Sequence, residues 1–586
     1  MTYLPTKRAI IETHLQVVNS KRVNYDPHVD EDLKMRITDR SVWWVVALSS
    51  LLSLGMAAPV VSLIEAVKRA DKVAVRALLQ QRVDVNRPEA DGMTALHWAA
   101  RLDDVETADL LIRAGANVKA ATRYGVLPLS LASANGNAVM IERLLEAGAD
   151  ANAALPEGET PLMSAAGTGN VAAVKALLAH GADISARERS KGQDALMWAA
   201  ADGHAAAVQV LIEAGADVHA RSKGGFTPLL FGVRRGAIDV VRVLLAAGAD
   251  VNETVQGAAF STGVAGPTED STSVLGLAII NGQFDIALLL LEHGSNPNAP
   301  DSRGSLLHAL AWMRRPGSGT GPAPPQPIGD SLEVARALLA RGANPNARIT
   351  WKEIPFDRDD GEAKSPPNIS VGRDFLTMVG ASPFFVAAKN GDVALMRVLA
   401  AKGADPRLST VQNVMPFMAA AGLGYWDGET PGPLNGTPES ERLEAVKLAL
   451  ELSGQDVNAV ADFGDFPIAG DGQKLLFAYP DNLEQLPASA IADVRWTGST
   501  ALHGAAIMDQ LSIIQFLVEK GARLDARNRL GWTPLMVTQG MLIAANGRWK
   551  PRAEALIRQL MIERGLDPAL YSQRGVSTTI VAPPRP

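Results

Sequence analysis

The chain has 586 residues, a formal net charge of −7 at pH 7, no cysteine and 47% hydrophobic residues. Without cysteine it can form no disulfide, no thiolate metal site and no cysteine nucleophile. The acidic balance and the lack of a basic block argue against nucleic-acid binding, which depends on neutralising phosphates.

Residues 1–58 read as an N-terminal extension that ends in an export signal. Residues 41–63 form an uncharged, apolar run with small residues near its end, which is typical of a secretory signal. A signal peptide does not begin far inside a protein, so we expect translation to start at Met35, which places a short basic segment before the run. Residues 35–58 would then be the signal, and the mature protein would be periplasmic or secreted.

Two other interpretations of this run stay open. It is roughly long enough to span a bilayer, so residues 41–63 could be an uncleaved anchor that leaves the protein as a membrane-anchored cytoplasmic scaffold. It could also be a buried first helix. Contact with a membrane is expected only for the anchored form.

One stretch of sequence, residues 192–224, is the pattern on which most of the chain is built. Asp194 is placed to cap a first helix, and Gly203 is placed to end it. A second helix follows, with an apolar stripe at i, i+3 and i+4 formed by Val208, Leu211 and Ile212. Similar stretches recur about every 33 residues. No copy can bury its apolar face alone, so the copies must stack.

The motifs that open these copies are specific. Gly-x-Thr-Pro-Leu stands at residues 158–162, 225–229 and 531–535, and Thr-x-Leu-His at 94–97 and 500–503. These motifs closely resemble the ankyrin repeat, and the chain looks like a bacterial, exported member of that family. The resemblance implies an all-α ankyrin-repeat solenoid of helix–turn–helix–hairpin units, about 12 in number. It also implies a protein–protein interaction scaffold.

The copies are regular over residues 59–251, where an N-terminal cap precedes them, and they carry long loop insertions over 252–570. Residues 571–586 are expected to form an extended tail. Three insertions fall where the family places hairpin fingers, at 252–272, 349–378 and 462–496. Two more join the helices of one repeat, at 314–329 and 422–439. We expect this decorated C-terminal half to take part in recognition.

No motif indicates catalysis or a cofactor, because the sequence has no nucleophile elbow, phosphate-binding loop or zinc-binding His-Glu-x-x-His. His97, His308 and His503 stand at the family's Thr-Pro-Leu-His position, where a structural hydrogen bond to the capping Thr is expected, although no Thr precedes His308. The acidic clusters at 357–362 and 462–471 lack calcium-loop spacing. We expect no catalytic, cofactor-binding or metal-binding residue and no enzyme. An assembly factor or an enzyme with a site in the C-terminal insertions is the alternative.

The partner-binding surface is expected on the first helices and the fingertips. In the family, the residue after the motif histidine faces the concave surface, and here it is Trp98, Trp198 or Phe231 in three of the copies. These side chains could be exposed anchors or core residues. The fingertip candidates are Arg123, Tyr124, Arg187, Arg221 and Lys223, with a solvated hairpin tip as the alternative for each. We expect a protein partner and no nucleic acid.

Overall fold

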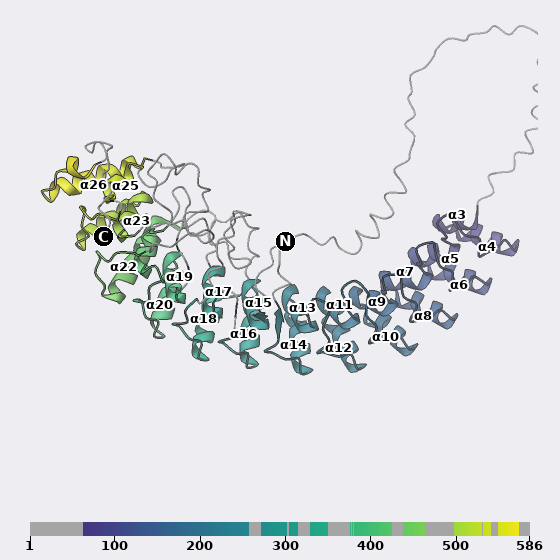
Figure 1. Ribbon diagram of the computed structural model, residues 1–586. Helices are drawn as coiled ribbons and strands as arrows, with labels where there is room; N and C mark the ends of the chain where they lie inside the picture. Colours follow the sequence, from purple (N-terminus) through teal and green to yellow (C-terminus); the bar gives the residue numbers. More distant parts are fainter. Residues whose placement is uncertain are drawn as a thin grey trace, which may run out of the picture. The chain divides into compact units, whose positions relative to one another are not determined.

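The computed structural model describes residues 62–256, 271–299, 301, 304–314, 329–349, 376, 378, 380–424, 437–462, 497–529, 531–540 and 549–572. These residues contain 24 α-helices, a 3-10 helix and one two-stranded sheet. The helices follow one another in pairs along the chain (Figure 1). The chain divides into two compact units, Met1–Asp84 and Val85–Pro586.

The first unit contributes one helical hairpin, made of α3 (Leu63–Lys68) and α4 (Lys72–Gln80). The Ser62 hydroxyl accepts a hydrogen bond from the Glu65 amide at 3.1 Å, and the Asp71 carboxylate caps α4 in the same way. These side chains satisfy backbone donors that the first turn of a helix leaves unpaired. That this hairpin is the N-terminal cap of the repeats stays a prediction.

In the second unit, each pair has a first helix that begins at an opening motif. These first helices are α5 (Ala95–Arg101), α7 (Pro128–Asn135), α9 (Pro161–Thr168), α11 (Ala195–Asp202), α13 (Pro228–Arg235), α15 (Val274–Ile280), α17 (Leu306–Arg314), α19 (Pro383–Lys389), α21 (Pro416–Ala420), α23 (Ala501–Ile507) and α25 (Pro534–Thr538). Their partners are α6 (Val105–Arg113), α8 (Ala138–Glu146), α10 (Val171–Ala179), α12 (Ala205–Glu213), α14 (Ile238–Ala246), α16 (Phe284–Glu292), α18 (Ser331–Ala340), α20 (Val393–Ala400), α22 (Glu439–Ser453), α24 (Leu511–Glu519) and α26 (Pro551–Glu563).

Capping explains where these helices begin and end. In α9, the Thr160 hydroxyl caps the first turn, Pro161 takes the first helical position and Gly169 ends the helix with a φ of 75°. Proline fits there because its missing N–H would have no partner in a helix, and glycine adopts a positive φ without steric cost. Asn170 then caps α10. The opening motif therefore encodes the helix–turn–helix directly.

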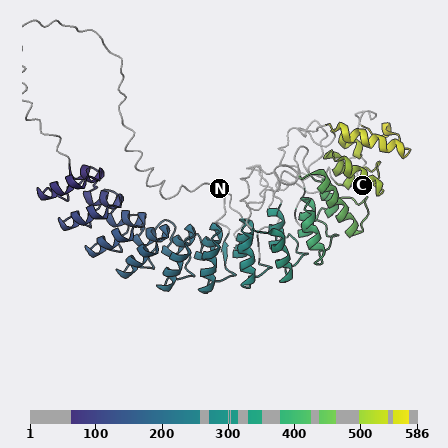
Figure 2. The same cartoon turned by 180° about the vertical axis from the view of Figure 1, so that it is seen from behind.

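The helices of the second unit form two layers. Each first helix packs on the first helices before and after it, each second helix packs on its own neighbours in the same way, and the two helices of a pair pack on each other (Figures 1 and 2). Ala99, Ala165 and Ala199 are fully buried in the first layer, where small side chains let helices approach closely. Leu211 is fully buried at the centre of its stripe. The expected all-α stacked fold is confirmed, whereas the count of about 12 repeats stays a prediction.

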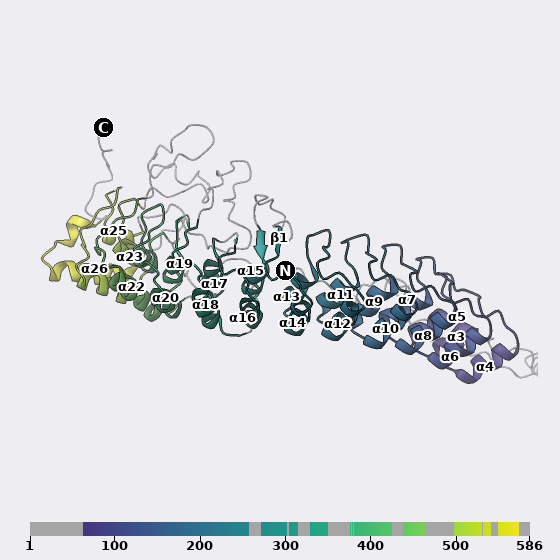
Figure 3. The ribbon, with the colours of Figure 1, turned by 90° about the horizontal axis from the view of Figure 1, so that it is seen from below.

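The loops between pairs form hairpin fingers, which over residues 85–256 project to one side of the helix layers (Figure 3). Within one finger, the Thr122 amide donates to the Val126 carbonyl at 2.9 Å. Neighbouring fingers are also joined through the backbone, since the Arg123 amide donates to the Asp91 carbonyl at 2.9 Å. The fingers are therefore tied to one another as well as to their own helices.

One finger contains regular strands. Strands β1 (Thr254–Gln256) and β2 (Ser271–Ser273) pair antiparallel, with Thr254 opposite Ser273. The two strands stand at the ends of the insertion at 252–272. Residues 257–270 and most of the insertions at 314–329, 349–378, 422–439 and 462–496 lie outside the described residues.

Asparagine side chains join consecutive repeats just beyond the C-terminal ends of the second helices. Asn152 donates its amide N–H to the Gly181 carbonyl at 2.9 Å and accepts from the Asp183 backbone amide at 2.6 Å. Asparagines 86, 298, 346 and 458 make the same two bonds to the next repeat. Each bond satisfies a backbone group at a helix end that would otherwise have no protein partner. We call this pair of bonds the asparagine staple.

The expected export signal lies at 35–58, outside the described residues. Among the helices that the structure describes, none combines the length and the apolar composition needed to cross a bilayer.

Candidate functional site

The three motif histidines are buried and use both ring nitrogens. In each, one nitrogen contacts the hydroxyl that caps its own helix and the other contacts a backbone carbonyl further along the chain. The pairs of contacts, all at 2.8–3.1 Å, are Thr94 and Val126 for His97, Ser305 and Ala381 for His308, and Thr500 and Trp532 for His503. The expected structural role is confirmed. At His308, Ser305 supplies the hydroxyl that the missing Thr would have given.

These histidines are unsuited to acid–base chemistry. Burial lowers the pKa of His308 and of His503 to about 4, and it also lowers the pKa of His97. The rings are therefore neutral near pH 7, with no nitrogen left for a substrate or a metal.

The three aromatic candidates differ in exposure. Trp198 and Phe231 are each only 9% exposed, which favours the core interpretation for both. Trp98 is half-buried, and its indole N–H donates to the Glu89 carboxylate at 2.7 Å. The guanidinium of Arg101 lies 5.2 Å from the Trp98 ring centroid. Of the three, Trp98 is the one whose ring is partly accessible.

Arg123 and Tyr124 lie on one fingertip and are both exposed. Tyr124 is 63% exposed, and the Arg123 guanidinium lies 5.3 Å from its ring centroid, within the range of a cation–π contact. Because the backbone of this finger is bonded to the preceding finger, the two side chains are presented from a fixed loop. They fit the expected fingertip position, and their partner-binding role stays a prediction.

Arg187, Arg221 and Lys223 are exposed fingertip residues that also join fingers together. The Arg187 guanidinium donates to the Arg221 carbonyl at 2.6 Å, and the Arg221 guanidinium donates to the Thr254 carbonyl of the next finger at 3.2 Å. The Lys223 ammonium donates to the carbonyl of Arg189. The structure therefore brings these three candidates together on consecutive fingers.

Four further basic residues lie beside them and were not among the predicted site residues. Arg189 and Lys191 share the finger of Arg187, while Arg234 and Arg235 end α13. The sequence contained a signal for them, since this finger reads Arg-Glu-Arg-Ser-Lys and the helix ends in two consecutive arginines. A prediction made one position at a time does not detect such clustering.

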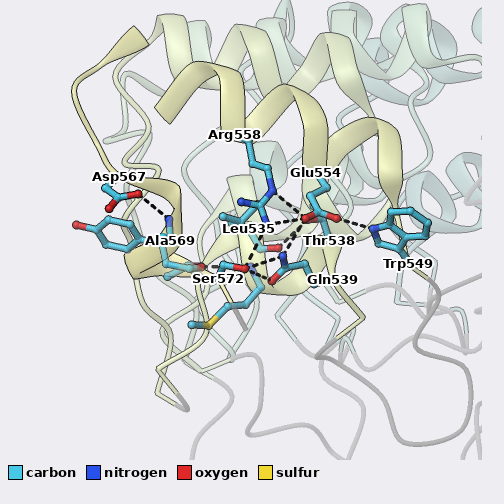
Figure 4. Close-up of polar contacts among 12 residues, drawn as sticks. Leu535, Thr538, Gln539, Trp549, Glu554, Arg558, Asp567, Ala569 and Ser572 are labelled. Atoms are coloured by element: carbon cyan, nitrogen blue, oxygen red, sulfur yellow. Dashed lines mark hydrogen bonds and ion pairs between the residues drawn. The ribbon is translucent and has the colours of Figure 1, made fainter. Parts of the chain in front are cut away.

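A polar cluster near the C-terminus is structural as well (Figure 4). The Glu554 carboxylate accepts from the Trp549 indole at 2.5 Å, from the Gln539 amide at 2.9 Å and from the Arg558 guanidinium at 2.8 Å. Burial alone would raise the pKa of Glu554, but these donors outweigh it and lower that pKa. The Ser572 hydroxyl accepts from Gln539 and Arg558, and it donates to the side-chain oxygen of Gln539 at 3.2 Å. The cluster holds the 3-10 helix at Pro568–Tyr571 against the last helix pair.

The described residues contain no group of three or more acidic or histidine side chains that could hold a metal. The acidic cluster at 357–362 and residues 463–471 of the second cluster lie outside the described part of the chain. Asp462 is exposed, and its backbone amide donates to the Gln412 carbonyl at 2.8 Å.

Comparison with known proteins supports the family suggested by the opening motifs. A model of ankyrin repeats in three copies matches residues 62–122, 129–222 and 186–255, and a model of the single ankyrin repeat matches 497–529. The "Ankyrin repeat and KH domain-containing protein mask-1" of Caenorhabditis elegans is 27% identical over 264 residues. That similarity covers 42% of this chain and 8% of the relative, so the chain corresponds to a small part of that protein.

Proposed function

We propose, from the premise that this chain is an all-α ankyrin-repeat solenoid, that it binds a protein partner through its first helices and fingers. Ankyrin repeats imply a protein–protein interaction scaffold, and such repeats are typically non-enzymatic. The family leaves open which surface is used and what binds there.

The observation that supports this surface is the way its exposed side chains are held. Arg123 and Tyr124 stack on a finger whose backbone is bonded to its neighbour, and Arg187 and Arg221 are anchored on carbonyls of adjacent fingers. Side chains that are already ordered lose less conformational entropy when a partner binds. Arginine and tyrosine are also among the residues that most often dominate binding energy.

Site-specific crosslinking of the full chain tests the choice of surface. A photoreactive amino acid at position 124 or 223 should crosslink to one discrete protein in an extract of the native source. The same group at position 175, an exposed residue of α10 on the second-helix side, serves as the control. Equal labelling from position 175, or no adduct from either fingertip, would contradict the proposal.

We also propose that the protein works in the periplasm or outside the cell. This proposal is supported by the apolar run at 41–63 and by Met35, and it predicts a mature N-terminus near Ala57. Mass spectrometry of the native protein measures that terminus directly. Peptides that contain Met1 in the exported protein would exclude the start at Met35, whereas an intact run in a membrane fraction would indicate the anchored scaffold.

A further inference from the structure

Seven basic side chains gather on two consecutive fingers and on the first helix that follows them. All are exposed, in a protein whose net charge is −7. We call this the basic finger surface, and its members are Arg187, Arg189, Lys191, Arg221, Lys223, Arg234 and Arg235.

Several contacts show that the basic finger surface is continuous. The Arg187 guanidinium reaches the Arg221 carbonyl at 2.6 Å, and the Lys223 amide donates to the Lys191 carbonyl at 2.8 Å. The Arg234 guanidinium lies 5.8 Å from the ring centroid of Phe226, which belongs to the second of the two fingers. The fingers and the end of α13 therefore present one surface.

Glu253 lies 3.6 Å from the Arg221 guanidinium, but the carboxylates on the two fingers and their helices do little to neutralise that surface. Glu188 is 7% exposed and turns inward, where it accepts the backbone amides of Ser190 at 2.6 Å and Lys191 at 2.8 Å. Asp194 is 6% exposed and caps α11. Asp202 is exposed at the end of α11. Most of the positive charge thus faces solvent while most of the negative charge is directed into the fold.

The layer of second helices in the same repeats is acidic rather than basic. The exposed acidic residues there are Glu213, Asp217, Asp239 and Asp250. The basic Arg242 of that layer pairs with Asp239 at 3.1 Å. The preceding finger is also acidic, with Glu157 at its tip. The basic finger surface is therefore bounded on two sides by negative charge, which favours a ligand of limited width.

We propose that the basic finger surface binds an extended, acidic segment of a partner protein. This inference rests on the proposed function and names the chemistry of the partner. Guanidinium groups bind carboxylates through paired hydrogen bonds. Arg187 and Arg189 each donate one N–H to a backbone carbonyl, which orients the guanidinium and leaves other N–H donors for a partner.

Nucleic acid fits this surface less well. Single-stranded nucleic acid is held by stacking on exposed aromatic rings as well as by charge. The aromatic rings beneath these fingers, Trp198, Phe226 and Phe231, are only 5–9% exposed. The acidic boundaries would also repel a polyanion longer than the surface itself.

The spacing of the fingers indicates the pattern of the acidic segment. Packed helices lie about 8–10 Å apart, and an extended chain advances about 3.3 Å per residue. Carboxylates placed about three residues apart would therefore meet successive fingers.

The test uses the full chain and a synthetic extended peptide with glutamate at every third position and serine between. Binding is followed by fluorescence anisotropy at low and high salt. The charge-reversed variant K191E/R235E should raise the Kd roughly tenfold, because it replaces two exposed attractions with repulsions. The variant R113E/K175E carries the same change in net charge on exposed residues of the second helices, and it should leave the Kd unchanged.

Four results would overturn the inference: no salt-dependent binding of the glutamate peptide, equal binding of its glutamine analogue, equal weakening by both variants, or tighter binding of a single-stranded DNA of equal charge. Crosslinking at position 124 or 223 tests the proposed function separately. A discrete crosslinked partner without binding of the glutamate peptide would contradict the acidic-segment proposal and leave the proposed protein-binding function intact.

Discussion

Glu253 is a buried carboxylate at a position that several other repeats fill with alanine. Its backbone amide bonds the carbonyl three residues before it, as Ala153, Ala186 and Ala220 do. The side chain is 7% exposed and accepts a hydrogen bond from the Thr227 hydroxyl, which also caps α13. Burial raises the pKa of Glu253 from 4.5 to about 7, and it outweighs the Thr227 hydroxyl and the Arg221 guanidinium 3.6 Å away, which both act to lower that pKa. Glu253 therefore titrates near neutral pH, at the base of the β1–β2 finger.

The direction of the pH effect follows from that shift. Because the folded state holds the proton more tightly than the unfolded chain, the stability that the protonated carboxyl contributes is present at low pH. It is lost as the pH rises from 4.5 to about 7, and above that range no further change is expected from this group. Loss of the proton should weaken the contact between α13 and the β1–β2 finger.

Hydrogen exchange measures this effect locally. Between pH 5 and pH 8, after correction for the intrinsic rate, opening of residues 227–235 and 271–276 should become more frequent. Glu253→Gln keeps the shape and a hydrogen-bond acceptor for Thr227 but cannot ionise, so it should remove the dependence. A wild-type protein whose opening is equally frequent at both pH values would contradict the assignment.

The sequence predicted the roles of some residues and not of others. The hydroxyl partner of each motif histidine was predictable because the motif places a capping hydroxyl three residues before the ring, and Ser305 supplies it for His308. The second partner, a carbonyl of the next repeat, lies outside the motif. The burial of Trp198 and Phe231 was not predictable, since one position on a first helix can face either solvent or the next helix. The raised pKa of Glu253 depends on tertiary burial, which an isolated charge in a sequence does not show.

At the scale of the elements, the asparagine staple is present at some junctions and missing at others. Lys119, Ser185 and His219 stand where Asn152 makes its two bonds, so the backbone amides of Asp150, Asp217 and Asp250 receive no such asparagine. Lys119 also lines a cavity of about 230 Å³ next to Asp150. Three junctions of the regular repeats therefore lack a contact that the same fold supports elsewhere.

Restoring the staple should stabilise these junctions. Lys119→Asn and His219→Asn should each add about 0.5–1.5 kcal/mol, the net worth of a typical hydrogen bond. Asn152→Ala should cost a similar amount or more, because it leaves the Gly181 carbonyl and the Asp183 amide without their partner. Equilibrium denaturation combined with hydrogen exchange at 148–150 and 248–250 checks the gains. Lys119→Ala separates the staple from simple removal of the lysine, and an equal gain from that variant would refute the mechanism.

The sequence predicted the helices well and the fingers less well. Helix positions follow from local chemistry, as when Thr160, Pro161 and Gly169 fix both ends of α9. The fingers are held by backbone bonds to neighbouring repeats, such as that from Arg189 to the Glu157 carbonyl, which no local pattern encodes. The sequence shows the basic clusters at 187–191 and 234–235. That they form one surface depends on contacts between repeats, such as that from Arg187 to the Arg221 carbonyl.

At the scale of the whole molecule, stacking makes each helix pair depend on its neighbours rather than on a common core. The sequence could predict that dependence from the recurring apolar faces. It could not show how tightly particular repeats approach each other. Gly504 in α23 is such a place, because a methyl group there would lie 2.4 Å from the Leu423 amide nitrogen and 2.8 Å from the Gly422 carbonyl carbon.

Gly504→Ala should therefore force α21 and α23 apart, at a cost of about 1–3 kcal/mol that is typical of overpacking. Because helices contact only neighbouring elements, hydrogen exchange should accelerate in α21–α26 and remain unchanged in α5–α14. Gly224→Ala is the matched control, since a methyl group at that position meets nothing nearer than the Ser222 hydroxyl at 4.0 Å. Faster exchange spread evenly from α5 to α26 would mean that the repeats unfold as one cooperative body, and the nearest-neighbour account would fail.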